Sequence, residues 1–207
     1  MNGKKITTIV FDIGGVLLDI HPERTYQYIS DSTDINIDVV KNRFPWDAHD
    51  EYERGNLTNK EWFFAFRDSL PQPCCLKEID FWKGWSLLLG KEKETVKLLS
   101  VLSQSYSTWL LSNTNPKHIQ DEIEENYLFP SLVDGAIYSF DTRYRKPEKN
   151  IYSFLLKKSK TQPEQCVFID DLIENVETAR LVGMHAIHFI NYNLLLEELK
   201  DLGVHIL

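Results

Sequence analysis

The sequence is poor in cysteine and has no long apolar run. Its three cysteines make no disulfide framework, since Cys74 and Cys75 are adjacent and Cys166 lies in an apolar stretch, and their spacing supplies no metal cluster. No apolar run approaches the ~20 residues that a membrane-spanning helix needs. The apolar stretch near the N-terminus breaks at Asp12, which makes it too short for a signal peptide. These absences predict reduced thiols, a cytoplasmic location and no membrane partner.

The sequence also has fewer basic than acidic residues. The 207 residues include 23 Lys and Arg against 31 Asp and Glu, a formal net charge of −8. Such a charge argues against nucleic acid as a partner and, on its face, against phosphate. The hydrophobic fraction of 43% is ordinary for a globular protein and excludes disordered and fibrous classes. The length suits one domain, or a core of ~135 residues that carries a smaller insert.

Short β-branched runs alternate with helical patterns along most of the chain. This alternation predicts an α/β fold with a doubly wound parallel sheet and helices on both of its faces. In such sheets the chemistry lies beyond the carboxyl ends of the strands. Strands are expected at 6–11, 107–111, 135–139, 166–169 and 186–190, and helices at 92–104, 116–126, 148–159, 174–182 and 193–201.

One segment, residues 19–90, interrupts the alternation and contains helical patterns only. It holds 12 of the 25 aromatic residues of the chain, which is enough apolar bulk for a small core of its own. Thr58 and Glu61 have the spacing of a capping box that opens a helix. We therefore expect an all-helical insert with hinges at 18–22 and 89–91. Its helices are predicted near 23–31, 35–43, 47–54, 58–69 and 76–88.

Four polar clusters fall at or after the ends of the expected strands. Because the carboxyl ends of parallel strands meet at one edge of a sheet, residues far apart in the sequence can share a site there. Each cluster alone is a weak signal, but their order and strand context together are a strong one. The clusters are Asp12-Ile13-Gly14, Ser112-Asn113-Thr114-Asn115, Arg145-Lys146-Pro147, and Asp170-Asp171 with Asn175.

The acidic members suit phosphoryl and metal chemistry. Asp12 ends the first strand, where its carboxylate could attack phosphorus and give an aspartyl-phosphate. The adjacent Asp170 and Asp171 would repel each other and Asp12 without a cation between them, and hard oxygen ligands suit Mg²⁺. The carbonyl of Gly14 could face the same metal. The alternatives are a turn or helix cap for each acid and a plain tight turn at Gly14.

The other two clusters suit an anion. Ser112 offers a hydroxyl, and the backbone amides after it lead, through Asn113, into a helix expected to start at Pro116, where phosphate oxygens bind well. Lys146 would neutralise the repulsion between a carboxylate and an incoming phosphate. The alternatives are simple capping by Ser112 and Asn113, and a solvated surface position for Lys146. The neighbouring Arg143 and Arg145 compete for the same role.

The order and spacing of these clusters resemble the four motifs of the haloacid dehalogenase (HAD) superfamily, in the branch with a helical cap between the first and second motifs. The resemblance spans essentially the whole chain and is nearest to sugar-phosphate phosphatases and the phosphatase domain of soluble epoxide hydrolase. It implies a Rossmann-like core of residues 1–18 and 91–207 and a cap of residues 19–90. The matching segments are 11–17 (FDIGGVL), 110–114 (LLSNT), 145–148 (RKPE) and 168–175 (FIDDLIEN).

The resemblance implies an Mg²⁺-dependent phosphatase that acts on a small phosphorylated metabolite, such as a sugar phosphate. In that reading Asp12 is the nucleophile, and Ser112, Asn113 and Lys146 bind the phosphoryl group. Asp171 aligns with a direct metal ligand and Asp170 with a second ligand, direct or through water. Asn175 supports the loop or a water. Dehalogenases of the superfamily lack the paired acid, so the Asp170-Asp171 pair favours phosphoryl over carbon chemistry.

The sequence departs from the family pattern at one position. Phosphatases of this family usually carry an Asp two residues after the nucleophile as general acid and base, and Gly14 stands there instead. This leaves open a second function, a non-hydrolytic phosphate- and metal-binding regulatory protein. None of the six histidines has metal-pair spacing, and His49 with Trp46 is at most part of a substrate pocket. The sequence predicts no oligomeric state.

Overall fold

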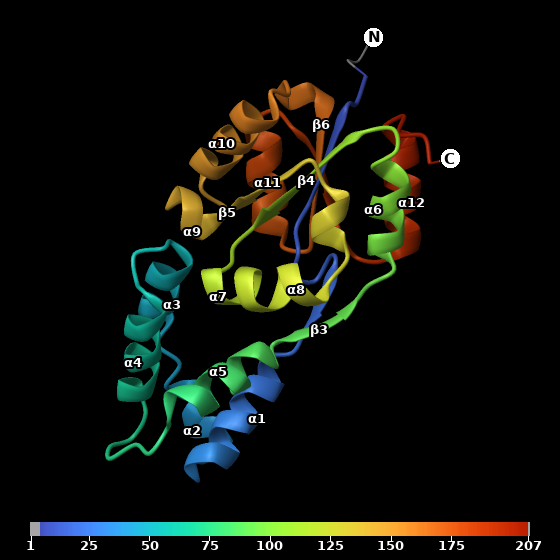
Figure 1. Cartoon of the computed structure of the whole chain (residues 1–207). Helices are drawn as coiled ribbons and strands as arrows, with labels where there is room; N and C mark the ends of the chain where they lie inside the picture. Colours follow the sequence, from blue (N-terminus) through green and yellow to red (C-terminus); the bar gives the residue numbers. More distant parts are fainter. Residues whose placement is uncertain (1–4, 207) are drawn as a thin grey trace.

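A five-stranded parallel sheet forms the centre of the molecule (Figure 1). The computed structural model describes residues 5–206, and its strand order is β5-β4-β1-β6-β7. All four residues of β1 are buried, as expected for a parallel strand between two helical layers. The strands are β1 (Thr8–Phe11), β4 (Ser107–Ser112), β5 (Gly135–Tyr138), β6 (Cys166–Asp170) and β7 (His185–His188).

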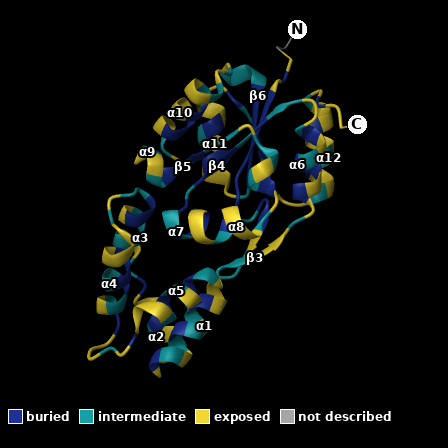
Figure 2. Ribbon diagram, in the orientation of Figure 1, coloured by how far each residue is buried: buried dark blue, intermediate teal, exposed yellow. Residues whose placement is uncertain are grey.

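Helices cover both faces of this sheet, which confirms the predicted doubly wound fold (Figure 1). One apolar core includes residues of α6 (Thr95–Leu102) and α12 (Tyr192–Asp201). A second core, on the opposite face, includes residues of α10 (Lys149–Ser159) and α11 (Ile173–Leu181). Figure 2 shows that the outer sides of these helices are exposed, so the alternation of buried and exposed positions follows the helical period.

The direction of the winding changes next to β1. The chain passes from β1 to β4 on one side, and later to β6 on the other, so the crevice at the carboxyl end of β1 lies at a topological switch point. Open parallel sheets bind ligands at such points because no crossover connection covers them. The first and fourth polar clusters therefore open onto the same crevice.

Residues 22–86 form a separate helical unit with an apolar core of its own. This core is largely aromatic and includes Tyr52, Trp62, Phe66 and Phe81, all fully buried. The capping box of Thr58 and Glu61 is present, with both reciprocal hydrogen bonds. The helices are α1 (Pro22–Thr33), α2 (Ile37–Asn42), α3 (Trp46–Glu53), α4 (Asn59–Ser69) and α5 (Glu78–Ser86).

A two-stranded antiparallel ribbon joins the helical unit to the sheet. β2 (Leu18–Ile20) pairs with β3 (Leu89–Glu92), and β3 runs directly into the core (Figure 1). The prediction of hinges at these positions without any strand was incomplete. Three- and four-residue strands carry too few positions for an alternating pattern, and each strand is stabilised by a partner about 70 residues away.

Three other boundaries differ from the prediction. The expected helix at 116–126 is instead α7 (Pro116–His118), a π-helical turn (Ile119–Ile123) and α8 (Glu124–Asn126). A short helix, α9 (Ser139–Thr142), follows β5, and α10 begins two residues after Pro147. Two short 3₁₀ turns, Phe129–Leu132 and Pro163–Gln165, complete the connections. Among the described residues, no helix is both long and apolar enough to cross a membrane.

Candidate active site

Asp12 lies at the carboxyl end of the central strand. Its backbone N–H donates to the carbonyl of Ile169, which extends the β1–β6 ladder by one residue, and its Oδ1 accepts from the N–H of Ile13 at 2.7 Å. The side chain is almost fully buried but lines the cavity between the sheet and the helical unit. The strand therefore fixes the position of this carboxylate at the edge of the cavity.

Lys146 brings the only buried ammonium group of the described residues into this site. Its Nζ lies 2.8 Å from Asp12 Oδ1 and 2.7 Å from Asp170 Oδ2. Burial opposes the charge on the ammonium, but the two carboxylates outweigh it and raise the pKa of Lys146 above its usual value. The lysine is thus a cation at neutral pH, and its neighbour Arg145 contacts Asp50 and Glu53 instead.

Asp170 and Asp171 end β6 and have different surroundings. Asp170 is fully buried, and its two oxygens accept from Asn175 Nδ2 at 2.9 and 3.1 Å and from the N–H of Leu172 at 2.8 Å. Asp171 is half-exposed, and its backbone carbonyl contacts His188 Nε2 at 3.0 Å. Asn175 therefore orients Asp170, in line with its predicted supporting role, and the Asp171 carboxylate remains the freest ligand of the pair.

The three carboxylates fit a hard divalent cation. Oxygens of Asp12, Asp170 and Asp171 all lie within 4.8 Å of one another. Burial raises the pKa of Asp12 to about 7, with Lys146 opposing and Asp170 adding to the shift. The pKa of Asp171 is also raised, mainly by burial and to a smaller extent by the charge of Asp170. One ammonium group is therefore not enough to hold all three ionised, and a divalent cation with oxygen preference, such as Mg²⁺, would complete the charge balance.

Ser112 and Asn113 follow β4 and line the same cavity. The Asn113 side chain donates to the carbonyl of Lys146 at 2.9 Å and accepts from the N–H of Lys146 at 2.8 Å. Its amide thus clamps the backbone that carries the lysine, a contact that the sequence analysis missed. Phosphate binding by Ser112 and Asn113 stays a prediction, and Asn113 would contribute through its backbone because its side chain is already engaged.

Gly14 and Gly15 differ in whether the structure requires a glycine at their position. Gly15 has φ +74°, and a Cβ there would lie 2.1 Å from Asp171 Oδ2. No other residue fits that conformation and that contact. A Cβ on Gly14 would meet only the side chain of Ile20, at 3.3 Å. Gly14 is therefore not required by the backbone, and a side chain at this position would need a small shift of Ile20.

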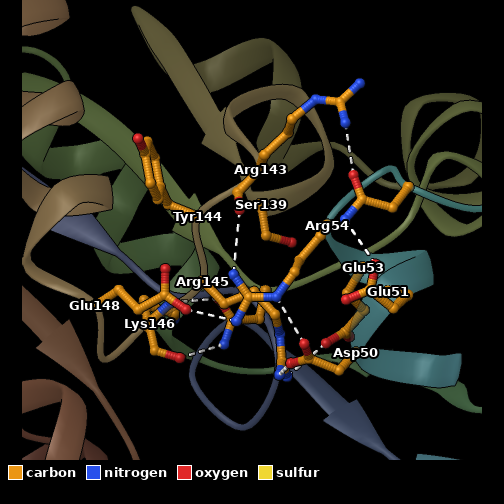
Figure 3. Close-up of polar contacts among 12 residues, drawn as sticks. Asp50, Glu51, Glu53, Arg54, Ser139, Arg143, Tyr144, Arg145, Lys146 and Glu148 are labelled. Carbon is orange, nitrogen blue, oxygen red and sulfur yellow. Dashed lines mark hydrogen bonds and ion pairs between the residues drawn. The ribbon is translucent and has the colours of Figure 1, made fainter. Parts of the chain in front are cut away.

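Arg145 joins the helical unit to the loop that carries Lys146. Its Nη2 lies 2.6 Å from Glu53 Oε2, and its Nη1 pairs with Asp50, both on α3 (Figure 3). Arg54, which directly follows α3, contacts Glu148 Oε1 at 2.5 Å. We call these five residues the α3–loop cluster. It was not predicted, because nothing in the spacing of 50–54 and 145–148 indicates that they meet.

Two histidines, both in ring contact with Trp85, line the cavity. His118 is buried, stacks on Trp85 with ring centroids 5.2 Å apart, and contacts the carbonyl of Trp85 through Nε2. Burial lowers the pKa of His118 to about 4. His49 of α3 lies 3.8 Å from Glu53, and burial likewise lowers its pKa. Both rings are neutral at neutral pH, and both His49 and Trp46 line the cavity.

A comparison with known families decides the class of the chain. The model for haloacid dehalogenase-like hydrolases matches residues 6–183. The chain belongs to this family. The match includes the helical unit and four of the five strands of the sheet, β1, β4, β5 and β6, which confirms the resemblance seen in the sequence. All four polar clusters lie within the matched residues of this hydrolase.

The relatives of this hydrolase include phosphatases. It is 28% identical over 188 residues to D-ribitol-5-phosphate phosphatase of Bacteroides thetaiotaomicron, covering 86% of this chain and 89% of that protein. It is 24% identical over 193 residues to a sesquiterpene phosphatase of Aspergillus oryzae, covering 93% and 94%. The names of these relatives indicate a phosphatase-like hydrolase, and they differ widely in the alcohol that carries the phosphate.

Solved structures show the same fold. A HAD family enzyme from Bacteroides thetaiotaomicron, in complex with magnesium and inorganic phosphate, superposes with a TM-score of 0.81 over 92% of this chain and 98% of that chain, at 22% identity. A 2-haloacid dehalogenase from Pseudomonas syringae superposes with a TM-score of 0.63 over 89% and 86%, at 15% identity. The likeness extends over the helical unit in both cases, so the whole architecture is shared.

Proposed function

We propose that this hydrolase is an Mg²⁺-dependent phosphatase that releases phosphate from a small phosphorylated metabolite through an aspartyl-phosphate at Asp12. The observation that carries the proposal is the packing of three carboxylates within 4.8 Å around one buried ammonium group. The phosphatases among its relatives, and the magnesium and phosphate in the related structure, support the same chemistry.

In this mechanism Asp12, Asp170, Asp171 and the carbonyl of Gly14 hold the cation. Bound there, Mg²⁺ supplies positive charge against the phosphate oxygens. Lys146 adds a second positive charge beside the nucleophile, and Ser112 and the backbone amides that follow it bind the remaining oxygens. Because Lys146 already contacts Asp12, the dianionic phosphate meets a carboxylate whose charge is balanced.

The bond changes then occur at Asp12. Its carboxylate oxygen attacks phosphorus, the P–O bond to the alcohol breaks, and the alkoxide takes a proton from water, since Gly14 offers no acid. The hydroxide left by that water then attacks the aspartyl-phosphate, which regenerates the carboxylate and releases hydrogen phosphate. Asn113 keeps the backbone of Lys146 in place during both steps, and Asn175 does the same for Asp170.

We propose that residues 19–90 act as a cap over this site and that residues 1–18 and 91–207 form the catalytic core. The β2–β3 ribbon is then the connection about which the cap moves, and closure would exclude bulk water from the first step. The α3–loop cluster supports this role, because it ties the cap to the loop that carries Lys146.

A Mg²⁺-dependent screen of phosphate esters, run with the wild type and Asp12→Asn, tests the proposal. We expect phosphate release that needs Mg²⁺ and is lost in Asp12→Asn. Full activity of that variant would contradict the mechanism. The second candidate, a non-hydrolytic phosphate- and metal-binding protein, is favoured by Gly14 alone. It predicts that Mg²⁺ and a phosphate mimic such as vanadate bind to a protein that turns over no ester.

A further inference from the structure

The cavity over the carboxylates is much larger than a phosphoryl group. Its volume is about 960 Å³, and it extends from Asp12 and Lys146 to the helical unit. Cavities of about 300–1,000 Å³ are typical of sites that enclose a drug-sized ligand. Most of this space therefore remains for the alcohol part of the substrate, and the residues around it determine which alcohol fits.

The helical unit lines its part of the cavity with aromatic rings. Trp46 is 65% exposed although its ring lies 4.4 Å from that of Phe44, centroid to centroid. Phe44 and Trp85 are nearly parallel, at 14°, and Trp85 is parallel to His118 within 9°. All of these residues line the cavity. Trp46, at the end of this row of rings, is tilted by 48° from Phe44, and its exposed ring offers a face on which a flat partner can stack.

Charges at this end of the cavity exclude a second anionic group. The lining holds three cationic residues, and each already faces a carboxylate: Lys146 faces Asp12, Lys93 lies 3.9 Å from Asp19, and Arg145 pairs with Glu53. The helical unit itself contributes only acidic groups among its charged lining residues, namely Asp47, Asp50 and Glu53. An alcohol with a carboxylate or a second phosphate would meet the carboxylate of Asp47, which forms no ion pair among the described residues, and no unpaired cation of the described lining to balance it.

The ion pairs among these side chains also argue against a polyol as the alcohol part of the substrate. The side chains of Asp50, Glu53 and Arg145 would be the natural partners for several hydroxyl groups, but they are engaged with each other or with Arg54. Breaking a half-buried ion pair to bind a hydroxyl exchanges a strong interaction for a weaker one. The Trp46 ring, by contrast, packs against Phe44 and His49 and still leaves the residue 65% exposed.

We propose that the part of the cavity beside Phe44, Trp46 and Trp85 is a subsite for the alcohol, which we call the ring subsite. It takes the single-phosphate ester of an uncharged alcohol that carries a flat ring, and this ring stacks against Trp46. The inference rests on the proposed function for the placement of the phosphate. It goes further in naming the class of alcohol and the residues that select it.

Matched esters of primary alcohols test the ring subsite, because their leaving groups are chemically alike. Phenylethyl phosphate carries a flat ring, cyclohexylethyl phosphate a puckered ring of the same size, and ribitol phosphate a polyol chain. Carboxyphenylethyl phosphate adds one negative charge. We expect kcat/KM to be about fivefold higher for the phenyl than for the cyclohexyl ester, with the carboxylate and polyol esters lower than both.

Variants of Trp46 test the role of this residue in the ring subsite. Trp46→Ala should raise KM for the phenyl ester about fivefold, leave kcat unchanged and abolish the preference for the flat ring, whereas Trp46→Phe should keep most of it. Trp46 is exposed, so neither change threatens folding. Ile79→Ala is the matched control, because Ile79 is a 75% exposed apolar residue of the helical unit outside the cavity lining.

Measurements of ligand binding without turnover distinguish a failure of the ring subsite from a failure of the proposed function. The phosphonate analogues of the phenyl and cyclohexyl esters, titrated calorimetrically into the wild type with Mg²⁺, should show the same fivefold preference without any turnover. If no ester is hydrolysed but this preference and its loss in Trp46→Ala are seen, the ring subsite stands and the proposed function fails. Equal binding of the two phosphonates, best turnover of ribitol phosphate, or a change in kcat alone in Trp46→Ala would overturn the ring subsite.

Discussion

Arg145 Nη2 lies 2.6 Å from Glu53 Oε2, which joins the residue directly before Lys146 to helix α3 of the helical unit. The Glu53 side chain is almost buried, whereas Arg145 also pairs with Asp50. A charge pair of this kind does not add much stability relative to apolar residues, but breaking it on one side leaves a buried charge without a partner. Arg145 thereby links the position of the helical unit to the position of the loop that carries Lys146.

Removal of Arg145 should therefore cost stability as well as activity. We expect Arg145→Ala to lower the free energy of unfolding by about 2 kcal/mol, because Glu53 stays buried and loses its partner. The double variant with Glu53→Gln should recover part of this loss. Urea unfolding measures both, with Arg24→Ala, an exposed arginine of α1, as the control. Equal losses in the single and double variants would show that the pair is not coupled.

Asn113→Ala should impair turnover without weakening metal binding. The substitution removes both hydrogen bonds to the backbone of Lys146, but it touches none of the three carboxylates. Each lost bond costs about 1 kcal/mol, so we expect kcat to fall by roughly tenfold to a hundredfold. Kinetics on any accepted ester, together with calorimetric titration of Mg²⁺, separates the two effects. A parallel loss of Mg²⁺ affinity would mean that Asn113 acts on the metal site instead.

Gly14→Asp should increase activity toward poor leaving groups. The new carboxylate stands where the family's usual acid is found, and it requires only a shift of the Ile20 side chain. General acid catalysis contributes about 10²–10⁴ in rate, so a gain of about 10² on an alkyl ester is expected. Gly15→Ala is the contrasting variant: its Cβ would collide with Asp171, and it should abolish Mg²⁺ binding. No gain in Gly14→Asp would imply that the native site already protonates the alkoxide.

Acid should destabilise the protein through His118. Burial lowers its pKa from 6.5 to about 4 in the folded state, so at pH values between these two limits the unfolded chain binds a proton that the folded chain does not. Stability is therefore lost as the pH falls from about 6.5 to about 4, by about 3 kcal/mol from this residue. His118→Gln should lose correspondingly less between pH 7 and pH 4 in urea unfolding. Identical pH profiles for the two proteins would rule out this assignment.

Strand ends and local caps could be predicted from the sequence because each depends on neighbouring residues. Asp12, Asp170 and Asp171 follow apolar runs whose carboxyl ends a parallel sheet must bring together, and the capping box of Thr58 and Glu61 is a four-residue pattern. The family resemblance then supplied the expected roles. The structure brings the three acids, Lys146 and Asn175 together, while their catalytic roles stay predictions.

The contacts that the sequence did not reveal are all long-range. Asn113 meets Lys146 across 33 residues, and Arg145 meets Asp50 across 95. Which of the neighbouring basic residues enters the site depends on the conformation of the loop that carries them. Here Lys146 contacts the carboxylates, whereas Arg145 contacts α3. The burial of His118 against Trp85 likewise needs the helical unit to pack on α7, which no local pattern encodes.

Trapping of the covalent intermediate tests the central claim most directly. The wild type with Mg²⁺ is mixed with a labelled phosphate ester, quenched in acid within the first turnover and digested. We predict an acid-stable, hydroxylamine-sensitive phosphoryl group on the peptide that contains Asp12, and none in Asp12→Asn. A label on Ser112, or rapid phosphate release with no labelled peptide at any time, would contradict nucleophilic attack by Asp12.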